Sequence, residues 1–309
     1  MILDQIDFSI LATLARDCRT SYSTIGSQTG LTPKSVKARV RNMVQNGVIE
    51  KFIVKVNPSA FGYRIAHIMV KTNNGITKDD VIQRIKQFGD LAYHLHHMGR
   101  TSVAAVVVKK SLDSGTIQLL NDTIDPATIS NITISELPLL TKPSETDLRI
   151  IKCLLLSGAR MEISEIAKEL GISEKTTTTR LERMKEGRLL EFSIQCDPAS
   201  MIGYVQFAIV INVEKAHYRN VSELIHREFQ ESILYHPSII DPNDSLTFVL
   251  YGENVFKVDS LLATVDSIEW VRSADIYILT KLQYYDDWII MEIDERLGPQ
   301  QLQKAYAQH

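Results

Sequence analysis

The chain has 309 residues, enough for two to four small domains, with a net charge of −3 and 44% hydrophobic residues. These totals are typical of a soluble globular protein and exclude a chain that is strongly basic as a whole. Three cysteines far apart in sequence, Cys18, Cys153 and Cys196, argue against a disulfide framework. The opening MILDQIDFSI lacks the basic start of a signal peptide, and no apolar run approaches the ~20 residues of a membrane span. We therefore expect a cytoplasmic protein without a membrane partner.

Positive charge is concentrated near the N-terminus. Residues 1–72 contain ten Lys and Arg against four acids, whereas residues 143–197 contain nine against ten. A local excess of this kind can attract a polyanion although the whole chain is slightly acidic.

The first three predicted elements are helices. Ile6, Ile10, Leu11 and Leu14 form a helical stripe, and a second helix runs from about residue 21 to 29, where Gly30 is placed to end it. Thr32 is a good N-cap for a third helix with proline at its first position, ending near residue 46. The alternating segment 48–56 is a strand pair at most. Three helices followed by a β-wing predict a winged helix-turn-helix.

The next segments change to a period of two and predict a βαββαβ order. They are IAHIMVK, DDVIQRIKQFG, LAYHLHHMG, SVAAVVVKK, SGTIQLLNDTID and ISNITISEL. This order is typical of a ferredoxin-like sandwich, an antiparallel sheet covered by two helices.

The whole pattern then repeats. Residues 3–63 recur as 143–204 with an offset of about 140, so that Asp7, Arg19, Gly30, Lys34, Arg39, Gly47, Phe52 and Tyr63 become Asp147, Arg160, Gly171, Lys175, Arg180, Gly187, Phe192 and Tyr204. We predict an α+β protein of two tandem units. The expected domains are winged helix-turn-helix 1–62, ferredoxin-like 63–140, winged 143–203, ferredoxin-like 204–283 and a tail 284–309, which is either a strand or a packing helix followed by a polar helix.

The first unit resembles the Lrp/AsnC regulators. The segment that carries this resemblance is LDQIDFSILATLARDCRTSYSTIGSQTGLTPKSVKARVRNMVQNGVIEKFIVKVNPSAFGY, above all the Leu-Asp-x-x-Asp opening, the Gly-Leu-Thr turn and Gly47-Val48-Ile49. It covers the first 140 residues well and residues 143–280 more loosely. The resemblance implies double-stranded DNA as a partner, self-association into a dimer or a larger homo-oligomer, and a small-molecule effector site in the ferredoxin-like domain. The duplication departs from the single unit of the family.

The third helix divides into two faces on a helical wheel. Val36, Val40 and Met43 form a core stripe, while the opposite face carries long donors and small side chains suited to base edges and phosphates. The predicted DNA-contacting residues are Thr32, Lys34, Ser35, Lys37, Ala38, Arg39, Arg41 and Gln45. Arg39 borders the core and is either a phosphate contact or part of an internal salt bridge. A plain solvated basic face is the alternative for the whole helix.

The second copy is less basic. Its core positions are Thr177, Leu181 and Met184, and Thr178 and Glu182 replace the equivalents of Lys37 and Arg41. An acid facing phosphates weakens attraction. The second winged domain is therefore either a weaker DNA reader or a structural partner, and its candidate contacts are Lys175, Thr176, Thr178, Thr179 and Arg183.

Two further candidate sites are weaker. The histidines His94, His96 and His97 invite a metal interpretation, but no Cys or carboxylate in the same segment completes it, so we expect no metal and no cofactor. The resemblance implies an amino-acid effector near the turn between the second and third strands, which points to Gly99, Thr101, Ser102 and, in the second copy, Asp244. Ser102 stands where the resemblance calls for an acid, so the turn is either a weak effector site or an ordinary hairpin.

The sequence thus predicts a DNA-binding transcriptional regulator and not an enzyme. No phosphate-binding loop, GxSxG motif or catalytic Cys/His pair is present. The sirohaem decarboxylases resemble the same two-domain design and provide an enzymatic alternative. A pure interaction scaffold is the third.

Overall fold

The computed structural model describes residues 1–109, 112–230, 232–235 and 245–298. The first unit contains α1 (Gln5–Arg16), α2 (Tyr22–Thr29), α3 (Pro33–Gln45), β1 (Ile49–Val56), β2 (Arg64–Lys71), α4 (Lys78–Ile85), β3 (Leu91–His97), β4 (Thr101–Val108), α5 (Ser114–Ile124) and β5 (Thr128–Ser135). The second contains α6 (Glu145–Ser157), α7 (Ile163–Leu170), α8 (Glu174–Glu186), β6 (Leu190–Cys196), β7 (Val205–Val213), α9 (Tyr218–Glu228), β8 (Ile233–Tyr235), β9 (Ser245–Gly252), α10 (Val255–Asp266) and β10 (Val271–Tyr284). Short 3-10 turns lie at Pro58–Phe61, Pro198–Ser200 and Lys215–His217.

The two units have the same element order, which confirms the predicted α+β tandem fold. Local sequence signals account for the helix ends: Thr32 caps α3 through its hydroxyl, and Gly30 ends α2 at φ +71°, a conformation that favours glycine. The core stripes predicted for the third helices are buried in both copies, at Val36, Val40 and Met43 and at Thr177, Leu181 and Met184.

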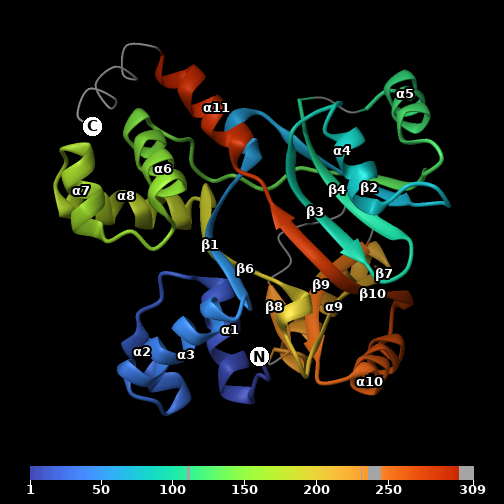
Figure 1. The fold of residues 1–309 in the computed structure, drawn as a ribbon, viewed down its shortest axis with the longest axis horizontal. Helices are drawn as coiled ribbons and strands as arrows, with labels where there is room; N and C mark the ends of the chain where they lie inside the picture. The colour runs from blue at the N-terminus through green and yellow to red at the C-terminus, as the bar shows by residue number, and fades with distance from the viewer. Residues whose placement is uncertain (110–111, 231, 236–244, 299–309) are drawn as a thin grey trace.

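The strand after each third helix does not fold back into a hairpin of its own. Instead β1 pairs antiparallel with β6, its equivalent in the other copy, and Val54 lies opposite Phe192. The two wings therefore form one ribbon shared by both winged domains, and a single hydrophobic core runs through both (Figure 1).

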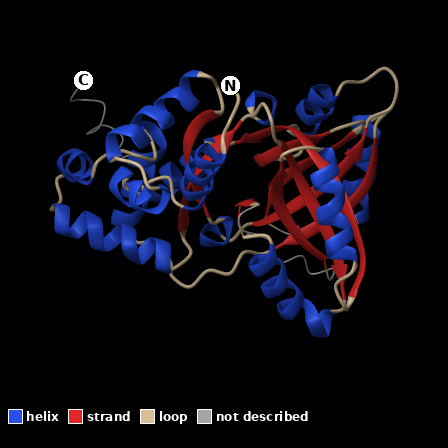
Figure 2. Ribbon diagram, turned by 90° about the horizontal axis from the view of Figure 1, so that it is seen from below, coloured by secondary structure: helices blue, strands red, loops and turns tan. Residues whose placement is uncertain are grey.

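The two ferredoxin-like domains are also joined. Their strands form one sheet in the order β5-β2-β4-β3-β10-β7-β9-β8. Each half has its own apolar core under its helices, α4 with α5 and α9 with α10. Strand β10 bridges the halves, because Val271 to Ile278 pair with β7 and Leu279 to Tyr284 with β3. Figure 2 shows the sheet curving between its flanking helices.

The predicted tail contains a packing helix, α11 (Asp287–Leu297), which rules out the strand interpretation for that segment. It packs on α6, where Lys152 pairs with Asp294, and Trp288 is buried against Phe61 and Tyr63. The polar helix expected after residue 299 lies outside the described residues. No helix in the described part of the chain is long and apolar enough to cross a membrane.

Candidate nucleic-acid interface and ligand pocket

Helix α3 presents an uninterrupted basic face. It contains four basic residues and no acid. Lys34, Lys37 and Arg41 are exposed, and none of them forms an ion pair or hydrogen bond with another described residue. Thr32, Ser35, Ala38 and Gln45 are exposed beside them, although the hydroxyls of Thr32 and Ser35 bond each other at 2.9 Å.

The sequence left two roles open for Arg39, a phosphate contact or an internal salt bridge. In the structure, Arg39 forms the internal salt bridge. Its Nη1 lies 2.9 Å from Oδ2 of Asp4 and 2.7 Å from Oδ1 of Asp7, and Asp7 is buried. These bonds raise the pKa of Arg39, with the hydrogen bond to Asp7 as the largest cause. This ion pair fixes α3 against α1 and draws the Arg39 guanidinium toward the body of the domain.

Helix α8 offers a mixed face. It holds four basic residues and three acids, and Glu182 is exposed in the middle of it. The Thr178 hydroxyl bonds the backbone carbonyl of Glu174 at 2.9 Å, and Thr176 bonds Ser173 at 2.8 Å. Lys175 and Thr179 are exposed, and Arg183 is directed to Asp147 and Thr141. Fewer free donors remain here than on α3.

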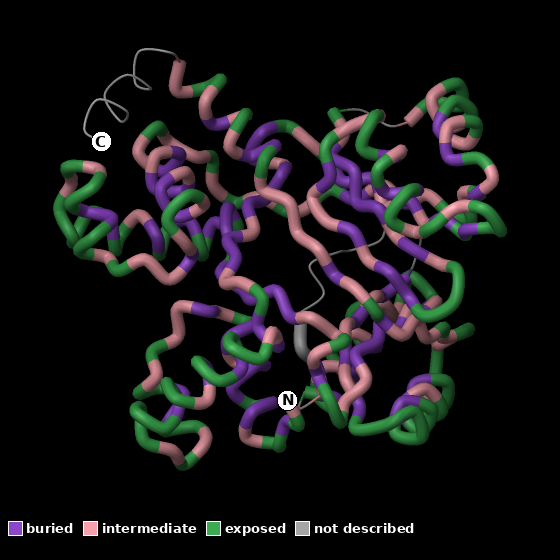
Figure 3. The backbone as a smooth tube through the Cα atoms, in the orientation of Figure 1, coloured by how far each residue is buried: buried purple, intermediate pink, exposed green. Residues whose placement is uncertain are grey.

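Reciprocal contacts hold the two winged domains together. Nη1 of Arg19 donates to the carbonyls of Ala159 and Met161, at 2.8 Å each. Ser193 donates to the carbonyl of Ala15 at 2.7 Å. Lys185 forms an ion pair with Asp17. Since β1 and β6 follow α3 and α8 directly, the shared ribbon also fixes the position of α3 relative to α8, the two candidate recognition helices (Figures 1 and 3).

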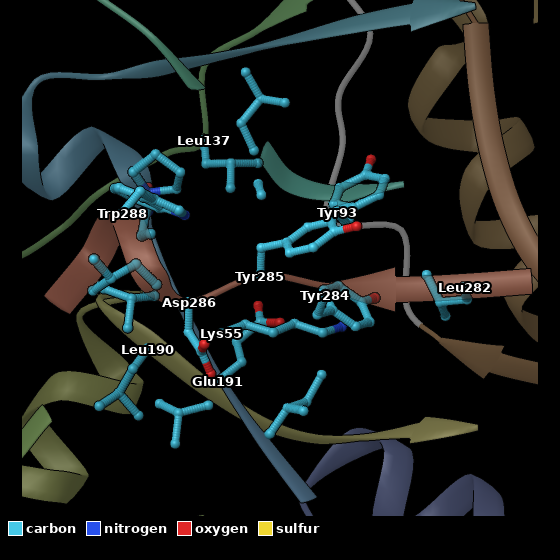
Figure 4. A pocket seen from close by; sticks show the side chains of 18 of the residues that line it. Lys55, Tyr93, Leu137, Leu190, Glu191, Leu282, Tyr284, Tyr285, Asp286 and Trp288 are labelled. Carbon is cyan, nitrogen blue, oxygen red and sulfur yellow. The ribbon is translucent and has the colours of Figure 1, made fainter. Parts of the chain in front are cut away.

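A pocket of about 520 Å³ lies between this ribbon and the large sheet. The ribbon contributes apolar side chains such as Leu190, the sheet contributes Leu282 and the rings of Tyr93 and Tyr284, and α11 contributes Trp288. Charged residues of both signs also line it: Lys51, Lys55, Arg188, Glu191 and Asp286. Figure 4 shows Lys55 reaching toward Tyr284, and its Nζ lies 5.1 Å from that ring centre. No local pattern in the sequence predicts this pocket, because its walls come from segments that lie far apart along the chain.

The turn predicted as an effector site does not line this pocket. Gly99 is exposed in the turn between β3 and β4 at φ +80°, and Thr101 begins β4. Ser102 is fully buried, with its hydroxyl 2.9 Å from Nδ1 of His96. That hydroxyl is therefore already bonded inside the protein. Asp244 lies outside the described residues.

Helix α4 brings a carboxylate to the histidines of β3, a contact that the sequence did not predict. Asp79 on α4 lies 3.1 Å from Nε2 of His96, and Nζ of Lys281 lies 2.8 Å from the same oxygen. These bonds, from Lys281 first and His96 second, hold the pKa of Asp79 at about 2. Burial lowers the pKa of His94 and of His97 to about 4. His94 and His96 lie on the face of β3 opposite to Tyr93 and do not line the pocket.

Comparisons with known proteins match these elements. A family model described as winged helix-turn-helix DNA-binding matches residues 3–50, and the AsnC-type helix-turn-helix domain matches residues 144–185. The uncharacterized HTH-type transcriptional regulator PH0140 of Pyrococcus horikoshii is 34% identical over 89 residues, 29% of this chain and 56% of that protein. The HTH-type transcriptional regulator Ptr1 of Methanocaldococcus jannaschii is 23% identical over 113 residues, 37% of this chain and 76% of that protein.

One solved structure shares the full architecture. The crystal structure of the siroheme decarboxylase NirDL matches 96% of this chain and 100% of its own with a TM-score of 0.52, at 14% identity. At that identity the likeness concerns the fold alone.

Proposed function

We propose that this chain, a tandem member of the Lrp/AsnC family of helix-turn-helix proteins, is a sequence-specific DNA-binding transcriptional regulator. The observation that carries the proposal is the α3 face, where Lys34, Lys37 and Arg41 are exposed and have no partner among the described residues. Such a face supplies phosphate contacts for affinity and donors for guanine edges in the major groove. The regulator names of the matched relatives support the same function.

The first winged domain is the main reader in this proposal. Thr32, Ser35, Ala38 and Gln45 complete its contact surface, and Arg39 supports the helix from behind. The second domain is either a weaker reader, through Lys175, Thr176, Thr178, Thr179 and Arg183, or a structural partner, since Glu182 repels phosphates. Because the chain already contains the pairing of two units, DNA binding needs no second copy, although further self-association into a homo-oligomer is compatible with it.

Selection from a pool of random double-stranded DNA tests this function. The full chain should enrich one sequence motif, and a Lys37→Ala/Arg41→Ala variant that remains folded should not. If the wild-type chain enriched no motif, its DNA binding would be driven by charge alone. The proposal of a sequence-specific regulator would then be wrong.

We further propose that the 520 Å³ pocket is the effector site. Its apolar walls and charges of both signs suit a zwitterion with an apolar body, the chemistry of an apolar amino acid. A ligand there would touch both β1 and β6, and so would bias the relative position of the recognition helices.

The enzymatic alternative rests on the same pocket. A tetrapyrrole would need to enter between the ribbon and the sheet, and the described residues that line this space include tyrosines but no histidine. Adding haem or a sirohaem analogue and recording the Soret region separates the two functions. A shifted Soret band that is lost when pocket residues are changed would favour the enzyme.

A further inference from the structure

Three potential metal ligands converge where α4 crosses β3. Asp79, His94 and His96 each place one potential ligand atom within 4.8 Å of the others. The two histidines are buried, whereas 64% of the Asp79 side chain is exposed, so the cluster lies at the edge of the protein and is open on one side.

Both histidine rings are held in place through Nδ1. Nδ1 of His94 lies 2.9 Å from the hydroxyl of Tyr285, and Nδ1 of His96 lies 2.9 Å from the hydroxyl of Ser102. Such outer hydrogen bonds fix the ring orientation and leave Nε2 to bind the metal. The sequence interpretation lacked the carboxylate because Asp79 comes from a different element.

An unpartnered buried atom provides a second, independent observation. Nε2 of His94 is buried and has no hydrogen-bond partner in the described structure. Because 97% of this residue is shielded from solvent, bulk water does not supply one either. A buried polar atom without a partner is unfavourable and calls for a ligand that the protein atoms do not supply.

We propose that Asp79, His94 and His96 form a binding site for a divalent transition metal of the zinc type. Two imidazoles and one carboxylate are the donors that such ions prefer, and the open side leaves room for water as a further ligand. Lys281, whose Nζ lies 2.8 Å from Asp79, would compete with a metal ion for this carboxylate. The site neighbours Tyr285, which also lines the 520 Å³ pocket, so the metal would fix one wall of that pocket. The proposal does not depend on DNA binding.

Cobalt provides the test, because Co²⁺ bound by nitrogen and oxygen ligands absorbs visible light. The full chain, free of any affinity tag and stripped with a chelator, is titrated with Co²⁺ and then with Zn²⁺. We expect a one-to-one Co²⁺ complex that Zn²⁺ displaces. Absence of a stoichiometric complex in the folded protein would overturn the proposal.

Three variants make the assignment specific. Asp79→Asn should weaken Zn²⁺ binding at least about tenfold. Asp80→Asn, at the exposed acid that follows Asp79 on α4, should not change it. Lys281→Gln should tighten binding because it removes the competing charge, which a purely structural role for Asp79 would not predict. Each variant is checked for its fold by circular dichroism, and equal affinity of the Asp79→Asn variant and the wild type would contradict the site.

Discussion

The guanidinium of Arg19 lies 5.2 Å from the ring centre of Phe192, and its repeat equivalent Arg160 lies 5.3 Å from the ring centre of Phe52. Each arginine thus stacks on the wing strand of the other unit. With the β1–β6 ribbon, this exchange makes the two winged domains one body. The stability of the pair should therefore depend on residues that a single winged domain would not need.

We expect Arg19→Met to lower the free energy of unfolding by about 2 kcal/mol, because it removes two charge-assisted hydrogen bonds and one cation–π contact. Urea denaturation measures this change. Arg16→Met, at an exposed arginine on α1, is the control and should stay within about 0.5 kcal/mol of the wild type. Equal losses in both variants would mean that these contacts of Arg19 contribute nothing to stability.

The second recognition helix should respond to charge. Glu182→Lys replaces a repelling charge by an attracting one and should strengthen DNA binding without sharpening the preference for one sequence. Anisotropy titrations on a preferred fragment and on scrambled DNA measure both effects. Asp266→Lys makes the same charge change at the distant end of α10 and should have little effect. If the two variants bind equally tightly, α8 does not face DNA.

Thr178→Ala separates the two roles left open for the second domain. The Thr178 hydroxyl bonds its own helix at 2.9 Å, so its loss should leave DNA affinity almost unchanged if the domain is structural. A loss near the 1–3 kcal/mol of a direct base contact would assign the domain a reading role.

The thiols should be inert in the native protein. Burial raises the pKa of Cys18 and of Cys153 from 9.0 to about 12, and Cys196 is also buried. Iodoacetamide at pH 8 should therefore leave all three unmodified until urea is added. The raised folded pKa adds stability below pH 9 that is lost as the pH rises from about 9 toward 12. Rapid native labelling of Cys18 would contradict the packing of the two winged domains.

Occupation of the pocket can be followed by fluorescence. The chain has two tryptophans, of which Trp288 lines the pocket and Trp270 stacks on His217 at 4.1 Å. In the Trp270→Phe variant, an apolar amino acid that binds should change the emission of Trp288. The Trp288→Phe variant is the matched control and should stay silent. If none of the twenty amino acids changes the emission of Trp288, the proposal that the pocket is an effector site is wrong.

Local patterns in the sequence predicted the elements and the repeat, because caps, apolar stripes and the turn at Gly30 act over a few residues. The pairing of β1 with β6 and of β3 with β10 was not predictable in this way, since each joins segments more than 130 residues apart. The same distinction between local and distant contacts explains which side-chain positions were predictable. The outward face of α3 follows from its helical period, whereas the approach of Asp79 to His96 depends on how α4 crosses the sheet.

The salt dependence of DNA binding tests the central claim most directly. Fluorescence anisotropy at several salt concentrations gives log K against log salt for the wild type, for Lys37→Ala/Arg41→Ala and for a control, Arg219→Ala/Arg227→Ala on α9. The α3 variant should bind more weakly and flatten the slope by up to roughly two units, because each lost phosphate contact removes about 0.9. The α9 control should keep the wild-type slope. An unchanged slope and affinity in the α3 variant would show that this helix is a solvated basic face and does not bind DNA.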